Sequence, residues 1–141
     1  MDFGHRRVHV AVADASHEII ASGVQRYDDD TRWTARIALA FELVDRVGAE
    51  HGLHFGALQA VGIGVPGPYT GARGITWNHR TAPEGVDTAF AERFHASVVV
   101  DNNTRLAALA EAVSRPGAVG DVVYVRLSDA SAAVSSSPAA S

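Results

Sequence analysis

The stretch VVVDNNTRLAALAE, residues 98–111, decides the fold. Three consecutive valines, Val98 to Val100, predict a strand that is buried on both faces, as central strands of parallel sheets are. The residues after the polar triplet 101–103 carry apolar side chains at helical spacing, namely Leu106, Leu109, Ala110 and Val113. We therefore expect a strand that passes directly into a helix.

The polar triplet Asp101-Asn102-Asn103 has two interpretations. It falls at the carboxyl end of a parallel strand, where open α/β sheets bind ligands beside the amino end of the following helix. Asn and Asp are also the favoured residues for capping a first helical turn. The triplet alone does not decide between a ligand site and a helix cap.

Composition limits the classes of protein. The chain has 141 residues, of which 47% are hydrophobic and 20% charged, which suits one globular domain. A net charge of −4 with scattered arginines argues against nucleic-acid binding by this segment, and the absence of cysteine excludes disulfides and thiolate metal sites. No apolar run is long enough to cross a bilayer, so we expect no membrane contact and a cytoplasmic location.

The rest of the chain alternates between strand and helix patterns. Strands are expected at 7–13, 18–24, 58–65, 71–77 and 122–127, and helices at 33–47, 86–94 and 103–114. The first two strands form a hairpin, and the first helix ends near Gly48 to Gly52. This order predicts an α/β domain with a mixed sheet flanked by helices.

Two groups of residues invite a metal interpretation. Asp28, Asp29 and Asp30 are followed by no further ligands at useful spacing, which favours a solvated loop. His51 and His54 have no third ligand placed to join them, which favours a solvated helix end. We predict no metal site.

Several motifs resemble the ROK family of bacterial sugar kinases and sugar-responsive repressors. They are Asp2-Phe3-Gly4, the segment 62–68 (GIGVPGP), the segment 100–111 described above, and the segment 121–129 (DVVYVRLSD). The resemblance covers residues 2 to 129 and implies one lobe of an actin-like ATPase fold, which is related to ribonuclease H. It further implies sugar-binding residues at Pro66, Gly67, Asn102 and Asn103, and the remnant of a phosphate turn at Asp2 and Gly4.

The resemblance breaks at the catalytic positions. Kinases of the family have aspartate where this chain has Asn103, and that aspartate takes the proton from the attacking sugar hydroxyl. An amide cannot accept that proton at neutral pH, and loss of a general base costs about a hundredfold to ten-thousandfold in rate. His5 and Arg6 also replace the small Gly and Thr of the phosphate turn. We therefore assign no catalytic residue.

Both ends of the sequence depart from the family pattern. We divide the chain into a first lobe, 1–129, and a low-complexity tail, 130–141, where the family continues with a glycine-rich loop. If the tail is reverse-translated with GC-rich codons and one guanine is added after the codon of Asp129, the shifted reading frame encodes such a loop. We therefore expect that the tail results from a frameshift or is disordered. At the other end, only Met1 precedes the Asp2-Phe3-Gly4 turn, where a strand is expected.

These observations favour a truncated ROK-type transcriptional regulator that binds a small sugar effector without catalysis. Its parent would contact DNA only through a winged helix not contained here, and would be a homo-oligomer. The alternative is a fragment of a degenerate, glucokinase-like sugar kinase, and only that reading would require ATP and Mg²⁺. A free-standing binding lobe is a third possibility.

Overall fold

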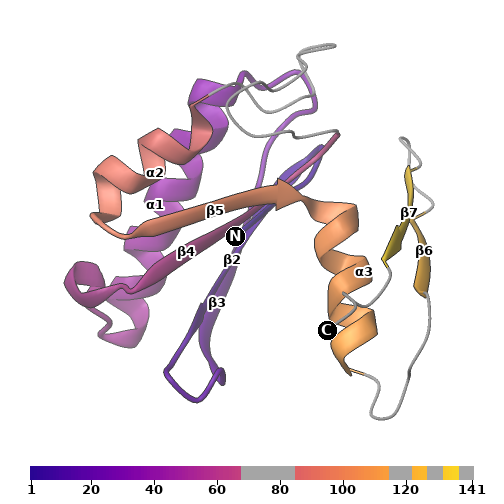
Figure 1. Ribbon diagram of the computed structural model, residues 1–141. Helices are drawn as coiled ribbons and strands as arrows, with labels where there is room; N and C mark the ends of the chain where they lie inside the picture. Colours follow the sequence, from indigo (N-terminus) through magenta and orange to yellow (C-terminus); the bar gives the residue numbers. More distant parts are fainter. Residues whose placement is uncertain (68–84, 115–121, 127–131, 137–141) are drawn as a thin grey trace.

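Five strands form one mixed sheet in the computed structural model, which describes residues 1–67, 85–114, 122–126 and 132–136 (Figure 1). The strands are β1 (Asp2–Phe3), β2 (Arg7–Ala13), β3 (Ile19–Arg26), β4 (Ala60–Val65) and β5 (Ser97–Asn102). Their spatial order is β3-β2-β1-β4-β5. The first three are antiparallel neighbours, whereas β1, β4 and β5 run parallel. The predicted α/β class and mixed sheet are confirmed.

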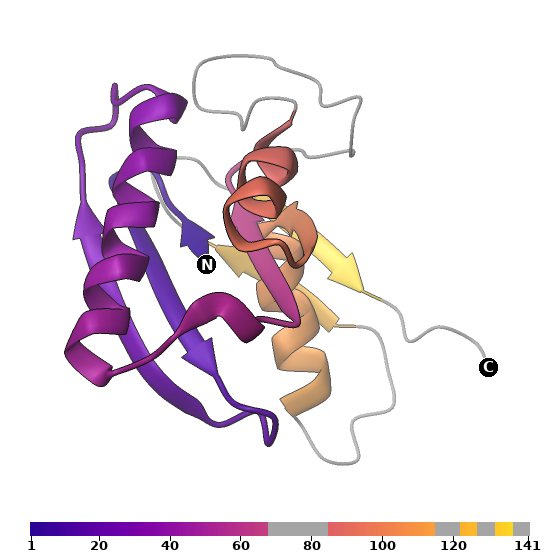
Figure 2. The same ribbon diagram turned by 90° about the vertical axis from the view of Figure 1, so that its left-hand side faces the viewer.

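Helices lie on both sides of this sheet. Helices α1 (Trp33–His51) and α2 (Val86–Phe94) cover one face, and α3 (Asn103–Ser114) lies on the other side (Figures 1 and 2). A short 3-10 helix, Phe55–Ala57, precedes β4. Gly52 ends α1 with a left-handed φ of 64°, which glycine adopts without steric cost. All three helices occupy the segments that the sequence predicts.

The core lies between the sheet and helices α1 and α2. Strand β2 shows the required alternation, because Val8 and Val10 are buried while Arg7 and His9 are exposed on the opposite face. Aromatic rings fill the centre, with Phe3 lying 5.3 Å from Trp33 and 6.1 Å from Phe90 between ring centroids. Burial of these rings removes large apolar areas from water and so stabilises the lobe.

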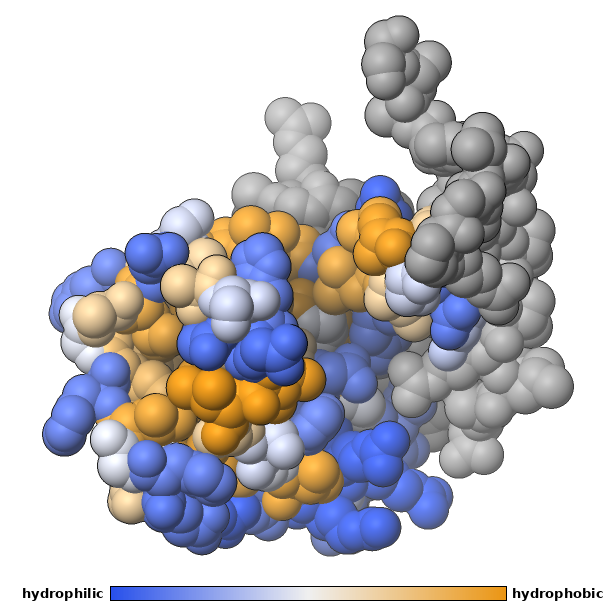
Figure 3. Space-filling view, turned by 90° about the horizontal axis from the view of Figure 1, so that it is seen from below, coloured by the Kyte–Doolittle hydropathy of each residue, from blue (hydrophilic) through white to orange (hydrophobic). Residues whose placement is uncertain are grey.

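The face of the sheet that α1 and α2 leave uncovered is called the open face below. Apolar side chains also reach the surface of the molecule, where they alternate with hydrophilic ones (Figure 3). The large ones are Ile19, Ile20, Val24, Val99, Leu106, Leu109 and Val113. Within the described part of the chain, no helix is long and apolar enough to span a membrane.

Two further strands form a separate hairpin alongside α3 (Figure 1). Strand β6 (Val122–Arg126) corresponds to the strand expected at 122–127 and pairs antiparallel with β7 (Ala132–Ser136). The second strand was not expected, because the Ala and Ser residues of this segment have low strand propensity. Pairing with β6 gives its backbone hydrogen-bond partners regardless of side-chain type.

The prediction that the three valines form a central strand, buried on both faces, is wrong. Strand β5 is at the edge of the five-stranded sheet, and Val99 is 63% exposed. Val98 and Val100 point to the other face and pack against the core. β-branched residues indicate a strand but do not report its neighbours, so the run could not reveal an edge position. The strand expected at 71–77 lies outside the described residues.

Candidate functional site

Parallel strands β1, β4 and β5 bring the predicted site residues to one edge of the sheet. Asp2 is in register with Gly64, and Gly64 with Asp101, so the three share one row across the strands. Val65 pairs with Asn102, which places Pro66 and Gly67 beside the last residue of β5. The carboxyl ends of parallel strands are where α/β sheets bind ligands.

Gly64 allows Asp2 and Asn103 to approach each other across β4. A Cβ atom at this glycine would lie 3.2 Å from Asp2 Oδ1, 3.3 Å from Asn103 Cβ and 3.4 Å from Leu106 Cδ1. These distances are at the short limit of van der Waals contact, so a side chain here would push the neighbours apart. Glycine at position 64 therefore brings a carboxylate and a carboxamide together.

Asn102 caps helix α3 and fastens the loop after β4. Its Oδ1 accepts hydrogen bonds from the backbone N–H groups of Thr104, at 2.9 Å, and Arg105, at 3.1 Å. Its Nδ2 donates to the carbonyl oxygen of Gly67. Asn102 is buried, and the capping interpretation of the triplet holds for it. Its carboxamide is engaged with protein groups, so Asn102 shapes the site more than it offers hydrogen bonds to a ligand.

Asn103 begins helix α3 and lies nearer to the open face. Its Nδ2 donates to the carbonyl oxygen of Phe3 at 3.2 Å, which ties the helix to β1. Thr104 Oγ1 lies 3.5 Å from its Oδ1. Helix α3 thus holds the Asn103 side chain in one orientation, with its carboxamide close to the turn after β1.

Asp2 has a carboxylate oxygen without a protein partner. Its Oδ1 is buried and accepts no hydrogen bond in the described structure. A buried carboxylate oxygen left unpaired costs free energy, and sites with such atoms are where ligands or water complete the bonding. Carboxylate and carboxamide groups together accept and donate hydrogen bonds to hydroxyl groups.

Hydrogen bonds within the turn from β1 to β2, and from the side chain of Tyr27, fix the conformation of this turn. The N–H of Gly4 donates to the carbonyl oxygen of Arg7 at 2.8 Å. The hydroxyl of Tyr27 lies 2.8 Å from the carbonyl oxygens of both Gly4 and Arg7, and its single proton is shared between these two acceptors. Partial burial raises the pKa of Tyr27 to about 12, so this donor keeps its proton at neutral pH.

Arg36 supports the same turn, a role that was not predicted from the sequence. It is fully buried, and its guanidinium donates to the carbonyl oxygens of Thr31, Asp29 and Gly4. The guanidinium carbon also lies 4.8 Å from the ring centroid of Tyr27. The helical spacing of 33, 37, 40 and 44 places position 36 on the same buried face, and that spacing is the signal that could have found it.

His5, one of the two residues that depart from the phosphate-turn pattern, faces the loop that contains Asp28, Asp29 and Asp30. Its Nδ1 lies 3.8 Å from Asp29 Oδ1. Among the described residues, no group of three or more His, Cys, Asp or Glu side chains could hold a metal ion. His51 Nδ1 instead lies 3.0 Å from the carbonyl oxygen of Val47 in its own helix.

A hollow of about 520 Å³ lies away from these residues, near the amino ends of β4 and β5. Phe55, Phe94, His54 and His95 line it, and the ion pair between Arg93 and Asp45, at 2.7 Å, lies beside it. None of the predicted site residues lines it. The candidate site is the group formed by Asp2, Gly64 and Asn103 at the carboxyl ends of the parallel strands, together with the loop at Pro66 and Gly67.

Comparison with known proteins identifies a family and a fold. The model of the ROK family matches residues 1–130. A solved structure of a ROK family glucokinase from Streptomyces griseus, in complex with glucose and AMPPNP, superimposes with a TM-score of 0.68 at 20% identity. The match covers 94% of this chain and 41% of that one, and it confirms the predicted actin-like ATPase fold. A search of curated proteins gives no match.

Proposed function

The chain belongs to the ROK family, and on that premise we propose that it is a sugar-binding lobe of a carbohydrate-responsive transcriptional regulator that performs no phosphoryl transfer. The proposed ligand is a small sugar whose hydroxyl groups contact Asp2, Asn103 and the backbone at Pro66 and Gly67. The parent protein would bind DNA through a separate winged-helix domain and act as a cytoplasmic homo-oligomer.

One observation carries the proposal: a carboxamide, Asn103, stands at the mouth of the site where kinases of the family carry their general base. Its nitrogen is engaged with the carbonyl oxygen of Phe3. The remaining oxygen can accept a hydrogen bond from a sugar hydroxyl but cannot remove its proton. Such a residue supports recognition without chemistry.

Thermal unfolding of the 141-residue chain with a panel of sugars tests the proposal. A sugar that binds only the folded state raises the free energy of unfolding by about 2.7 kcal/mol when its concentration is a hundred times its Kd. The midpoint of thermal unfolding rises accordingly. We expect glucose, xylose or N-acetylglucosamine to give such a shift and the open-chain polyol sorbitol to give none. No shift with any cyclic sugar would contradict sugar binding by this lobe.

A matched pair of variants on helix α3 locates the site. Asn103→Ala should abolish the sugar-dependent shift, because it removes the carboxamide beside Asp2. Ser114→Ala, at the other end of the helix, should leave the shift intact, since the Ser114 hydroxyl bonds only to the carbonyl oxygen of Glu111. Equal shifts in both variants would place the sugar elsewhere.

The alternative function is that of a degenerate sugar kinase. It is favoured by the carboxylate of Asp2, which the turn retains with an unpaired oxygen, and only this alternative would require ATP and Mg²⁺. ADP release in the presence of a hexose measures it. We expect none from the wild-type chain, and turnover by the wild-type chain would replace the regulator proposal with the kinase. Activity that appears only in Asn103→Asp would indicate a lost kinase.

A further inference from the structure

The hollow of about 520 Å³ lies at the end of the sheet opposite to the candidate site. The residues that line it come from α1, from the connection between α1 and β4, and from the end of α2. Strands β4 and β5 both begin beside it and end at the candidate site (Figure 1). Small-molecule sites have volumes of about 300–1,000 Å³, so the hollow is large enough for a ligand of its own.

Part of the lining is apolar and is held by the core. Phe94 is 7% exposed, and its ring stacks on that of Phe90 with 6.3 Å between the centroids. Phe55 also packs against the core cluster. Gly48 of α1 makes room for the Phe55 ring, since a Cβ atom at this glycine would lie 2.8 Å from Phe55 Cε2. Two aromatic rings therefore offer apolar surface to a ligand.

Hydrogen-bond donors lie beside these rings. Arg93 Nη2 donates to Asp45 Oδ1 at 2.7 Å, which leaves the other N–H groups of the guanidinium for a ligand. Two aromatic rings, with centroids 5.5 and 5.9 Å from its carbon, hold the guanidinium in place. His54 and His95 each carry at least one ring N–H, and within the described part of the chain neither ring has a hydrogen-bond partner. Donors from three side chains thus surround one carboxylate.

His95 has a backbone conformation that glycine adopts more easily. It ends α2 with φ 51° and ψ 35°, in the left-handed region, and its N–H donates to the carbonyl oxygen of Ala91 at 2.8 Å. Glycine is the usual residue in this position, and Gly52 occupies it at the end of α1. A side chain here costs stability relative to glycine, and such costs gather at functional sites. The backbone of His95 therefore points to a role for its imidazole.

We propose that this hollow binds a small monocarboxylic acid with an aromatic or aliphatic body. The body lies against Phe55 and Phe94, and the carboxylate accepts hydrogen bonds from Arg93 and the two imidazole rings. Asp45 offsets the charge of Arg93, so the hollow suits a single negative charge better than a doubly charged phosphate. The hollow shares no residue with the candidate site, and the inference does not depend on the proposed sugar function.

Titration of the 141-residue chain by calorimetry and proton NMR tests the inference. The probes are phenylacetate and hexanoate, with phenylacetamide as the uncharged control and acetate as the control without an apolar body. At least one probe should bind more tightly than both controls, because each control lacks the charge or the body. The imidazole signals of His54 and His95 should shift, and that of His17, between β2 and β3, should not. Absence of binding by both probes, or binding that shifts neither of the two signals, would overturn the inference.

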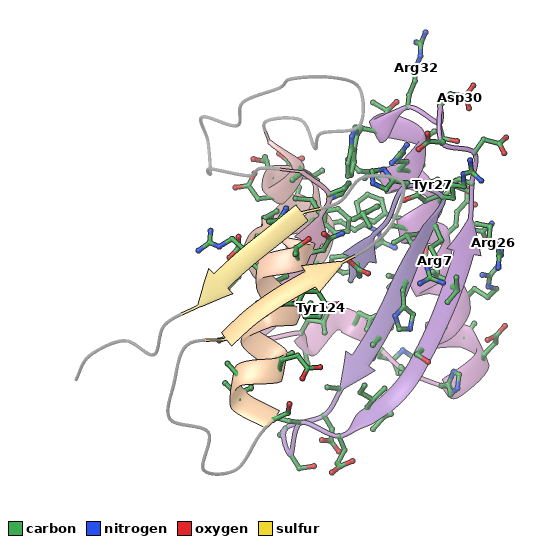
Figure 4. The ribbon with its side chains drawn as sticks, turned by 90° about the vertical axis from the view of Figure 1, so that its right-hand side faces the viewer. Arg7, Arg26, Tyr27, Asp30, Arg32 and Tyr124 are labelled. Carbon is green, nitrogen blue, oxygen red and sulfur yellow. The ribbon has the colours of Figure 1, made fainter. Side chains whose placement is uncertain are left out.

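Variants that each remove one charge make the test specific. Arg93→Gln should weaken probe binding about tenfold, and it should fold because its ion pair with Asp45 is exposed. Asp45→Asn should strengthen binding, since it removes a carboxylate that competes for Arg93. Figure 4 shows Arg7 on β2 opposite Arg26 on β3, and Arg32 directed away from the molecule, and none of the three lines the hollow. Arg32→Gln is therefore the matched control. Equal losses in the two Gln variants, or weaker binding by Asp45→Asn, would contradict a carboxylate at Arg93.

A variant of His95 separates binding from stability. His95→Gly should raise the midpoint of thermal unfolding, because glycine adopts the left-handed conformation without steric cost. The same variant should bind phenylacetate or hexanoate more weakly than the wild type, since it loses the imidazole N–H. An affinity equal to that of the wild type would contradict the proposed contact between the carboxylate and this ring.

Discussion

Arg36 carries a charge in the interior of the lobe, and its environment determines the cost of removing it. Its guanidinium donates to three backbone carbonyl oxygens and stacks near Tyr27 and Trp33. We predict that Arg36→Met lowers the free energy of unfolding by about 3 kcal/mol, because buried carbonyl groups lose their partners. Urea unfolding measures it.

The control for Arg36 is Arg46 on the same helix. Its guanidinium nitrogens lie 3.4 Å from Gln25 Oε1 in an exposed contact. Arg46→Met should change stability by no more than about 0.5 kcal/mol. If Arg36→Met were as mild as this control, the turn after β1 would not depend on the guanidinium.

The raised pKa of Tyr27 predicts how the free energy of unfolding depends on alkaline pH. Its pKa is raised to about 12, chiefly by burial, above the usual value of about 10. The folded state thus holds the proton of Tyr27 more tightly than the unfolded state does. The stabilisation that results is fully present below about pH 10 and is lost as the pH rises toward 12. Urea unfolding across this range should show the loss. Tyr27→Phe should flatten it; an unchanged slope would assign it to another group.

At the scale of elements, two glycines of β4 point to the same face of the sheet and provide a matched test. A Cβ at Gly64 would press on Asp2 Oδ1 and Asn103 Cβ, whereas a Cβ at Gly62 would meet nothing within 4 Å. Gly64→Ala should lower stability by about 1 kcal/mol and separate Asp2 from Asn103, which would abolish ligand-dependent stabilisation.

Gly62→Ala should be neutral or slightly stabilising, because glycine in a strand costs conformational entropy that alanine does not. Thermal unfolding of both variants, with and without the sugar found for the wild type, measures the difference. Equal behaviour of the two variants would show that the close approach of β1 and α3 across Gly64 is not required for the site.

At the scale of the whole molecule, the exposed edge of the sheet predicts self-association. Strand β5 is the last strand on its side of the described sheet, and Val99 is 63% exposed on it. Unpaired strand edges with apolar side chains bind further strands. Sedimentation velocity should show concentration-dependent association that Val99→Lys reduces. Val113→Lys, on α3 and 75% exposed, should not reduce it if the edge is responsible.

Much of the fold could be predicted from local patterns. Alternation marked β2, and the spacing of Trp33, Ala40, Val44 and Val47 marked α1, because the burial of one face imposes a period on the sequence. The start of α3 at Asn103 was predicted to the residue, since a strand that becomes a helix changes its period there, whereas β5 continues two residues beyond the valines. The site motifs also lie together at the carboxyl ends of the parallel strands, as was expected.

The contacts across the sheet could not be predicted in this way. Whether the valines of β5 were central or at the edge depended on which strand lay beyond them, which no local pattern records. The same holds for the buried charge of Arg36, whose partners Gly4 and Asp29 come from other segments. It holds also for the pairing of β7, whose alanines and serines carry no strand signal.

The sequence by itself therefore determined the three helices, strands β2 to β6 and the family, because each depends on periodicity or on motifs that are contiguous in the chain, whereas it predicted neither β1 nor β7 as a strand. Only the tertiary structure decided that Asn102 caps a helix, that Asp2 keeps an unpaired oxygen beside Asn103, and that Arg7 faces Arg26. Those relations join residues distant in sequence, and strand register, which is a property of the folded sheet, brings them together.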